Sequence, residues 1–203
     1  MNPGYLSIIV IVVVVILLAS GWRDFFLRGL SLQMILLFFI CWLLLFSIHI
    51  DVIGINFYLS SILLIVTGLW FTWKVEKSFI RLHIVSMAVF VGILDFALRE
   101  TTRFSSTPIV LIEEFKIAII LAVSFLVLLR PIFQQLPSLI FGLLLGDAIT
   151  MYTHRTSVPF TWGGPSFQDH WLFTVVVVRI MAGLLVFIFT SYRSGNRQQN
   201  ENE

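Results

Sequence analysis

The last apolar stretch of the chain, WLFTVVVVRIMAGLLVFIFTSY at residues 171–192, decides the class of fold. A helix rises about 1.5 Å per residue, so about 20 apolar residues cross a hydrocarbon core of about 30 Å. Arg179 lies near the middle of this stretch, and a guanidinium keeps its charge there. The stretch therefore predicts a membrane-spanning helix whose buried charge is offset by an acidic partner, by water, or by both.

The composition of the whole chain agrees with a membrane protein. Of its 203 residues 59% are hydrophobic and 12% are charged, against about a quarter charged in ordinary soluble domains. The apolar runs lie near residues 5–20, 32–50, 53–73, 80–98, 108–130, 136–152 and 172–191. They predict an all-α fold, a polytopic membrane helix bundle with seven transmembrane helices. The run at 136–152 is short and contains Asp147, so six full spans with a re-entrant segment are the alternative.

The distribution of basic residues predicts the orientation. With the N-terminus outside, eight Lys and Arg residues fall on the cytoplasmic side: Arg23, Arg28, Lys74, Lys77, Arg81, Arg130, Arg193 and Arg197. Four fall on the outer side: Arg99, Arg103, Lys116 and Arg155. Because cytoplasmic loops carry the excess of positive charge, we expect an N-out, C-in protein of the cytoplasmic (cell) membrane. Residues 1–192 then form one transmembrane domain, and residues 193–203 form a disordered polar cytoplasmic tail.

Five ionisable residues interrupt the apolar runs: Asp95, Glu113, Glu114, Asp147 and Arg179. In this orientation all five lie in the outer half of the bilayer or near its middle, which predicts an outward-facing polar intramembrane pocket. We expect Arg179 to be the counter-charge of Glu114 or Asp147. Glu113 and Glu114 are consecutive and point about 100° apart, so at most one of them faces the bundle centre directly.

Local spacing supplies further expectations. Asp95 and Arg99 are four residues apart and can pair along one helical face, which favours a structural role near the rim. Gly142 and Gly146 form a small-xxx-small pattern that suggests contact between the last two helices. The histidines are interpreted as solvated or interfacial side chains, since no i, i+4 pair of ligands exists. They are His49, His83, His154 and His170.

No enzyme motif matches. The chain lacks His-Glu-x-x-His, Gly-x-Ser-x-Gly and a phosphate-binding glycine loop. The paired glutamates of EEFKIA resemble those of CAAX-type proteases, but Ala118 stands where that motif has arginine, and its histidine motifs are absent. The single cysteine, Cys41, excludes a cysteine-built metal site. We therefore expect no cofactor, no metal and no nucleic acid, with the lipid bilayer as the one certain partner.

Two functions remain open. The first is binding or transport of a small polar solute or a proton at the polar pocket, with carboxylates that change protonation. The alternative is a non-catalytic membrane scaffold or sensor subunit whose buried charge pairs specify helix assembly. An intramembrane enzyme stands behind both.

The chain also resembles a known family. Its length, its hydropathy profile and the motif GWRDFF at residues 21–26, directly after the first span, are similar to the YphA-like group of small integral membrane proteins from Bacillus-type bacteria. The resemblance implies a bacterial cytoplasmic membrane. It supplies no activity, and no residue role is transferred from it.

Overall fold

The computed structural model describes the backbone of residues 3–22, 30–52, 55–103, 110–128, 132–154 and 161–200. The side chains are described over the same ranges, apart from residues 103, 110–114, 127–128, 132 and 189–200. Seven helices lie within these ranges: α1 (Tyr5–Ala19), α3 (Leu32–Leu45), α4 (Leu59–Lys74), α5 (Ser78–Arg103), α6 (Val110–Leu128), α7 (Ile132–Thr153) and α8 (Pro165–Asn200). Each predicted apolar run overlaps one of them, so the helical membrane fold is confirmed.

The described helices differ in length. Three spans are long and apolar enough to cross a membrane: Ser78–Thr102, Phe133–Thr153 and Pro165–Ile188. The α1, α3 and α4 helices have 15, 14 and 16 residues, fewer than the roughly 20 that a full crossing takes. The α7 helix is continuous over 22 residues although it contains Pro137 near its start. The shortness on which the six-span alternative rested is therefore not observed.

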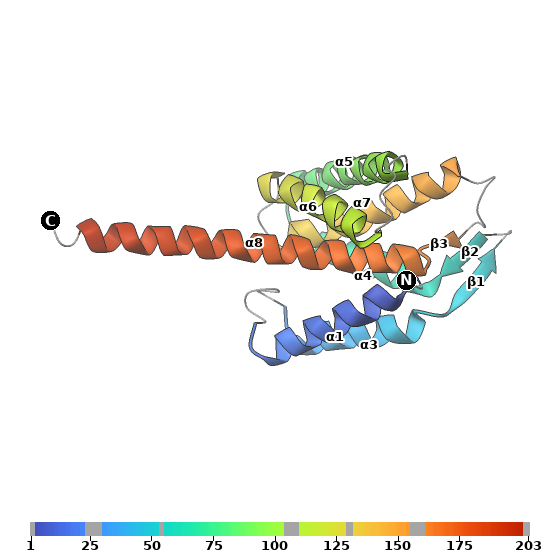
Figure 1. The fold of residues 1–203 in the computed structure, drawn as a ribbon, viewed down its shortest axis with the longest axis horizontal. Coiled ribbons are helices and arrows are strands. Elements are labelled where there is room, and N and C mark those ends of the chain that lie inside the picture. Colours follow the sequence, from blue (N-terminus) through green and yellow to red (C-terminus); the bar gives the residue numbers. More distant parts are fainter. Residues whose placement is uncertain are drawn as a thin grey trace.

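A small sheet lies at one end of the bundle, so the fold is not purely α. Strand β1 (His49–Val52) pairs antiparallel with β2 (Ile55–Tyr58), and β2 pairs parallel with β3 (Thr161–Trp162). We call this end of the molecule the sheet end (Figure 1). The α1, α4 and α8 helices begin there, and α5 and α7 end there. His49, which was interpreted as a solvated or interfacial side chain, lies exposed in β1.

The two ends of α8 differ from the sequence prediction. The helix begins at Pro165, seven residues before the apolar run, because proline fits the first helical position, where its missing N–H is not needed. Three polar residues, Gln168, Asp169 and His170, consequently lie in its first two turns. At the other end α8 continues to Asn200 and projects beyond the other helices (Figure 1). The backbone of residues 193–200 is thus helical, where a disordered tail was expected.

Glycines bring α5 and α7 into close contact. A Cβ on Gly142 would lie 2.6 Å from Cγ1 of Val91, and one on Gly92 would lie 2.9 Å from the carbonyl oxygen of Gly142. Gly142 and Gly146 both face α5 rather than α8. The suggested contact between the last two helices is present, but other residues make it. The apolar core around this contact includes the fully buried residues Leu64, Val91, Leu121, Phe125, Leu139 and Leu143.

Candidate functional site

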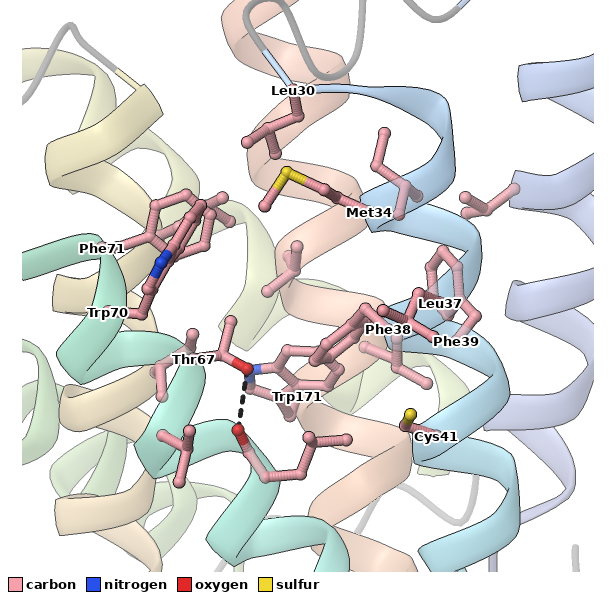
Figure 2. Close-up of a pocket in the computed structure, with 18 of the residues that line it drawn as sticks. Leu30, Met34, Leu37, Phe38, Phe39, Cys41, Thr67, Trp70, Phe71 and Trp171 are labelled. Atoms are coloured by element: carbon pink, nitrogen blue, oxygen red, sulfur yellow. Dashed lines mark hydrogen bonds between the residues drawn. The ribbon is translucent and has the colours of Figure 1, made fainter. Parts of the chain in front are cut away.

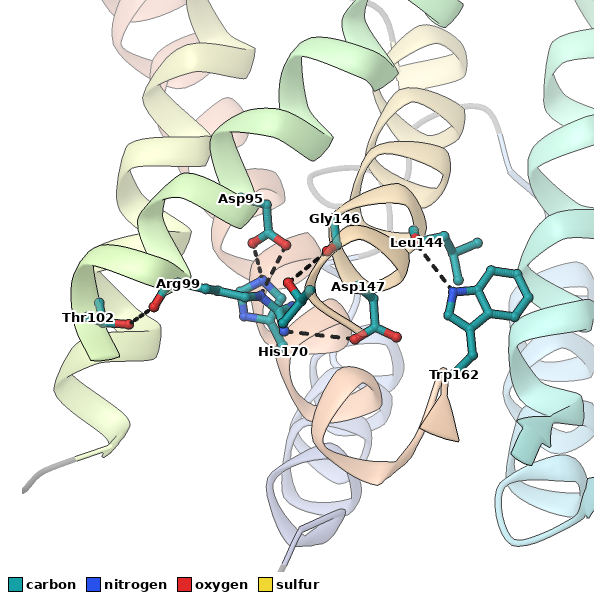
Figure 3. Close-up of polar contacts among 9 residues, drawn as sticks. Asp95, Arg99, Thr102, Leu144, Gly146, Asp147, Trp162 and His170 are labelled. Atoms are coloured by element: carbon teal, nitrogen blue, oxygen red, sulfur yellow. Dashed lines mark hydrogen bonds and ion pairs between the residues drawn. The ribbon is translucent and has the colours of Figure 1, made fainter. Parts of the chain in front are cut away.

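Four ionisable side chains from three helices meet at the sheet end (Figure 3). Asp95 and Arg99 lie on α5, Asp147 on α7 and His170 on α8. Oδ1 of Asp95 is 2.9 Å from Nε2 of His170, and its Oδ2 is 3.1 Å from Nε of Arg99. Nη1 of Arg99 is 4.0 Å from Oδ1 of Asp147. We call these four residues the charged network.

Exposure changes along the charged network. The side chains of Arg99 and Asp147 are 19% and 15% exposed, whereas those of Asp95 and His170 are 0% and 1% exposed. With a neutral imidazole, two carboxylates and one guanidinium give a formal charge of −2 + 1 = −1, and a protonated imidazole makes it zero. Because a buried charge is expensive unless it is paired, these contacts offset much of the desolvation of each group.

The turn between β3 and α8 fixes the position of Asp147. The backbone N–H of Gly163 donates to Oδ2 of Asp147 at 3.0 Å. Nε2 of Gln168 in turn donates to the carbonyl oxygen of Gly163 at 3.1 Å and to Oγ of Ser60 on α4 at 2.5 Å. These bonds connect the charged network to the first turn of α4. A shift of the β3–α8 turn would therefore move the carboxylate of Asp147.

Asp169 attaches the start of α1 to α8. Its Oδ2 accepts from the backbone N–H of Gly4 at 2.6 Å, and its Oδ1 accepts from the backbone N–H of Ser7 at 2.6 Å. The hydroxyl of Ser7 also donates to Oδ1. The first N–H groups of a helix have no partner within the helix, and a carboxylate is favourable near them. Asp169 therefore supplies from α8 the N-terminal cap that α1 lacks in its own sequence.

The charged network contains part of the predicted site and one unexpected member. Asp95 and Arg99 pair along α5 as expected, and Asp147 joins them through Arg99. His170 was interpreted as a solvated or interfacial residue and is instead buried against Asp95. The usable signal was Pro165, which starts α8 early enough to place His170 on the bundle-facing side. His154 also has an acidic partner, since its Nε2 lies 3.0 Å from each carboxylate oxygen of Glu100, in a partly exposed position.

Arg179 lies away from the charged network. It follows His170 by nine residues on α8, a separation of roughly 14 Å along the helix. Its Nη1 donates to Oε1 of Gln135 on α7 at 2.8 Å, in a buried position. The predicted pair with Asp147 is therefore wrong. The other predicted partner, Glu114, has a side chain outside the described part of the chain, as does Glu113.

The Arg179–Gln135 bond gives a testable contribution to stability. We expect Gln135→Leu to lower the free energy of unfolding by about 1.5–3 kcal/mol, because the change removes a buried hydrogen bond to a charged group. Unfolding in mixed detergent micelles, followed by circular dichroism, measures the difference. Gln134→Leu is the matched control, since Gln134 is the preceding residue on α7. Equal stability of the Gln135 variant and the wild type would contradict this contribution.

No group of three or more His, Cys, Asp or Glu side chains suited to hold a metal ion occurs among the residues that the structure describes. The fold and the site together define a helical integral membrane protein with ionisable groups buried at one end of its bundle. The chain belongs to the YphA-like integral membrane protein family, whose model matches residues 22–203. No curated protein and no solved structure matches the chain.

Proposed function

We propose that the protein binds a proton reversibly at the charged network, from the side of the membrane at which the sheet end lies. The observation that supports this proposal is the decrease in exposure from Arg99 and Asp147 to the buried pair of Asp95 and His170. A proton that reaches the partly exposed Asp147 meets a connected series of ionisable groups that leads to the buried pair of Asp95 and His170. Intramembrane ionisable residues that contact one another in this way are typical of proton-handling sites.

The chemistry of the four groups suits this role. An imidazole and two carboxylates can each take up a proton, whereas the guanidinium of Arg99 stays charged and lies between the carboxylates. One added proton changes the formal charge of the charged network from −1 to zero. Because charges interact strongly in a low-dielectric interior, and because the groups belong to α5, α7 and α8, proton binding changes the energy with which three helices pack.

The proposal includes a topology. The chain crosses a bacterial cytoplasmic membrane seven times with its N-terminus outside, so that the sheet end faces outward and the shorter helices cross together with flanking residues. The distribution of the described side chains supports this orientation. The basic residues Lys74, Lys77 and Arg81, with Trp70 and Trp73, lie where α4 ends and α5 begins, opposite the sheet end. Basic and aromatic residues are enriched at such a cytoplasmic boundary.

A structural role for the same contacts is the second candidate. It is favoured by the engagement of both oxygens of Asp95, one with His170 on α8 and one with Arg99 on α5. Such pairs can fix the register of helices without titrating. The two candidates differ in one measurable property. In the proton-binding role His170 gains and loses a proton within the folded protein, whereas in a purely structural pair it keeps one protonation state at every pH near neutrality.

The pH dependence of stability tests the proposal. Between pH 8 and pH 5 the midpoint of thermal unfolding of the wild type in detergent is expected to change by roughly 3 °C per kcal/mol of linked proton binding. His170→Gln is expected to remove that change, because glutamine can still donate to Asp95 but cannot take up a proton in this range. His154→Gln is the matched control, since it alters the partly exposed His154–Glu100 pair at the same end.

A change that persists in His170→Gln and disappears in His154→Gln would contradict proton binding at the charged network. A second measurement reports on the imidazole directly. In spectra of protein labelled with ¹⁵N-histidine, the resonances lost in His170→Gln identify His170, and their shifts are expected to follow pH. Shifts that stay constant from pH 5 to pH 8 would favour the structural role.

A further inference from the structure

An elongated apolar cavity of about 370 Å³ lies between α1, α3, α4, α7 and α8 (Figure 2). Arg179 is among the residues that line it. We propose that this cavity holds one acyl chain of an anionic membrane lipid. The proposal is independent of proton binding, because no member of the charged network lines the cavity.

The shape of the cavity fits a chain that runs parallel to the helices. Its lining on α8 extends from Trp171 to Arg179, and its lining on α4 extends from Leu63 to Phe71. Each interval is eight residues, or about 12 Å along a helix axis. Ligand pockets commonly have volumes of about 300–1,000 Å³ and mostly apolar walls. The cavity is thus elongated along the helices and lined mostly by apolar side chains, as an extended hydrocarbon chain requires.

The cavity is accessible from the bilayer. Leu37 on α3 and Val66 on α4 both line it, and they are 62% and 58% exposed. In an integral membrane protein, apolar side chains exposed in the middle of such helices face lipid. A lipid chain can therefore enter sideways between α3 and α4 without leaving the hydrocarbon. A water-soluble ligand would have to cross the apolar surface first.

The polar groups of the lining favour a lipid tail in the cavity and an anionic head group at its end. The hydroxyl of Thr67 is already engaged, since it donates to the carbonyl oxygen of Leu63 at 2.7 Å. Arg179 is the one charged side chain among the described residues of the lining. Trp70 also lines the cavity, and Nζ of Lys74 lies 4.1 Å from the centre of its ring.

These two cations set the direction of the lipid. Lys74 ends α4, and Arg179 is the α8 residue of the lining that lies farthest from the sheet end, so the positive charges gather at the end of the cavity opposite the sheet. Basic residues on the cytoplasmic side of a transmembrane helix attract anionic head groups. The chain of an inner-leaflet lipid would then point from Lys74 toward Trp171. Phosphatidylglycerol is a suitable probe, and zwitterionic phosphatidylcholine is its uncharged counterpart.

Closing the entrance tests the proposal. The full-length protein is incubated with an equal mixture of phosphatidylglycerol and phosphatidylcholine in detergent, and retained lipid is counted by native mass spectrometry. The wild type is expected to retain one phosphatidylglycerol, with a preference of about fivefold over phosphatidylcholine. Val66→Trp places an indole in the entrance and is expected to abolish retention. Leu69→Trp is the matched control, because Leu69 is 57% exposed on the same helix and does not line the cavity.

Two further experiments locate the acyl chain and the head group of the bound lipid. Cys41 lines the cavity and is the only cysteine, so added phosphatidylglycerol is expected to slow its alkylation by N-ethylmaleimide in the wild type but not in Val66→Trp. Lys74→Gln is expected to remove most of the preference for the anionic lipid while leaving retention of a lipid intact. The proposal is overturned if Val66→Trp retains lipid as the wild type does, if both tryptophan variants lose it equally, or if the wild type does not prefer phosphatidylglycerol. None of these variants alters the charged network, so the pH dependence of unfolding is expected to persist in all of them.

Discussion

Asp95→Ala is expected to lower the free energy of unfolding by about 3–5 kcal/mol, one of the two largest effects that we predict for this chain. The change removes the acceptor that His170 contacts at 2.9 Å and that Nε of Arg99 contacts at 3.1 Å. It leaves the imidazole buried in a site built for an ion pair, and it leaves Arg99 with Asp147 at 4.0 Å as its nearest carboxylate in the charged network. The cost of desolvating His170 and Arg99, which their contacts with Asp95 offset in the wild type, then lowers the stability of the fold.

Mixed-micelle unfolding measures this effect, and Asp51→Ala is its control, because Asp51 is an exposed aspartate in β1. The control is expected to unfold within about 0.5 kcal/mol of the wild type. A double variant, Asp95→Leu with His170→Leu, replaces the pair by apolar side chains and is expected to recover part of the lost stability. A double variant less stable than Asp95→Ala would show that the desolvation argument is wrong.

The helices were predictable because the bilayer imposes a long apolar run on each one. All seven runs overlap a helix, and the α5 pair of Asp95 and Arg99 followed from a spacing of four residues within one helix. Both inferences use information that lies within a single segment. Such information can be obtained from the sequence alone, because residues three or four positions apart lie on the same face of a helix.

Contacts between helices were not predictable in the same way. The bond between Arg179 and Gln135 depends on how α7 and α8 are set against each other along the bundle, and no spacing within either run encodes that offset. Sequence reasoning expected Glu114 or Asp147 because an acidic partner is the cheapest one for a buried guanidinium. An uncharged amide oxygen can also accept from a guanidinium, so the argument from charge alone did not indicate Gln135.

Short and polar elements were missed for a different reason. Strands β1 and β2 have four residues each, which is too short for an alternating pattern to stand out beside two long apolar runs. The first two turns of α8 were missed because a hydropathy run ignores polar helical residues, although Pro165 marked the true start. His170 was misinterpreted as a direct result, since a residue outside the helix has no predicted bundle-facing side.

Gly163→Ala is the second change with a large expected effect. Gly163 has a φ of +66°, a conformation that costs an L-residue about 1–2 kcal/mol. A Cβ there would lie 1.5 Å from Oγ and 2.7 Å from Cβ of Ser61 on α4, so the backbone must move even if the hydroxyl rotates. Overpacking of this kind typically costs about 1–3 kcal/mol, which gives a total loss of about 2–5 kcal/mol.

The adjacent glycine supplies the control for that change. A Cβ on Gly164 would lie 3.7 Å from Cε2 of Tyr58, an ordinary van der Waals contact, so Gly164→Ala is expected to unfold nearly as the wild type does. The Gly163 variant should also disturb the charged network, because the moving backbone N–H holds Oδ2 of Asp147 at 3.0 Å. Its unfolding midpoint is therefore expected to respond differently to pH, whereas that of Gly164→Ala keeps the wild-type response. Equal stability of the two alanine variants would contradict the close packing of the β3–α8 turn against Ser61.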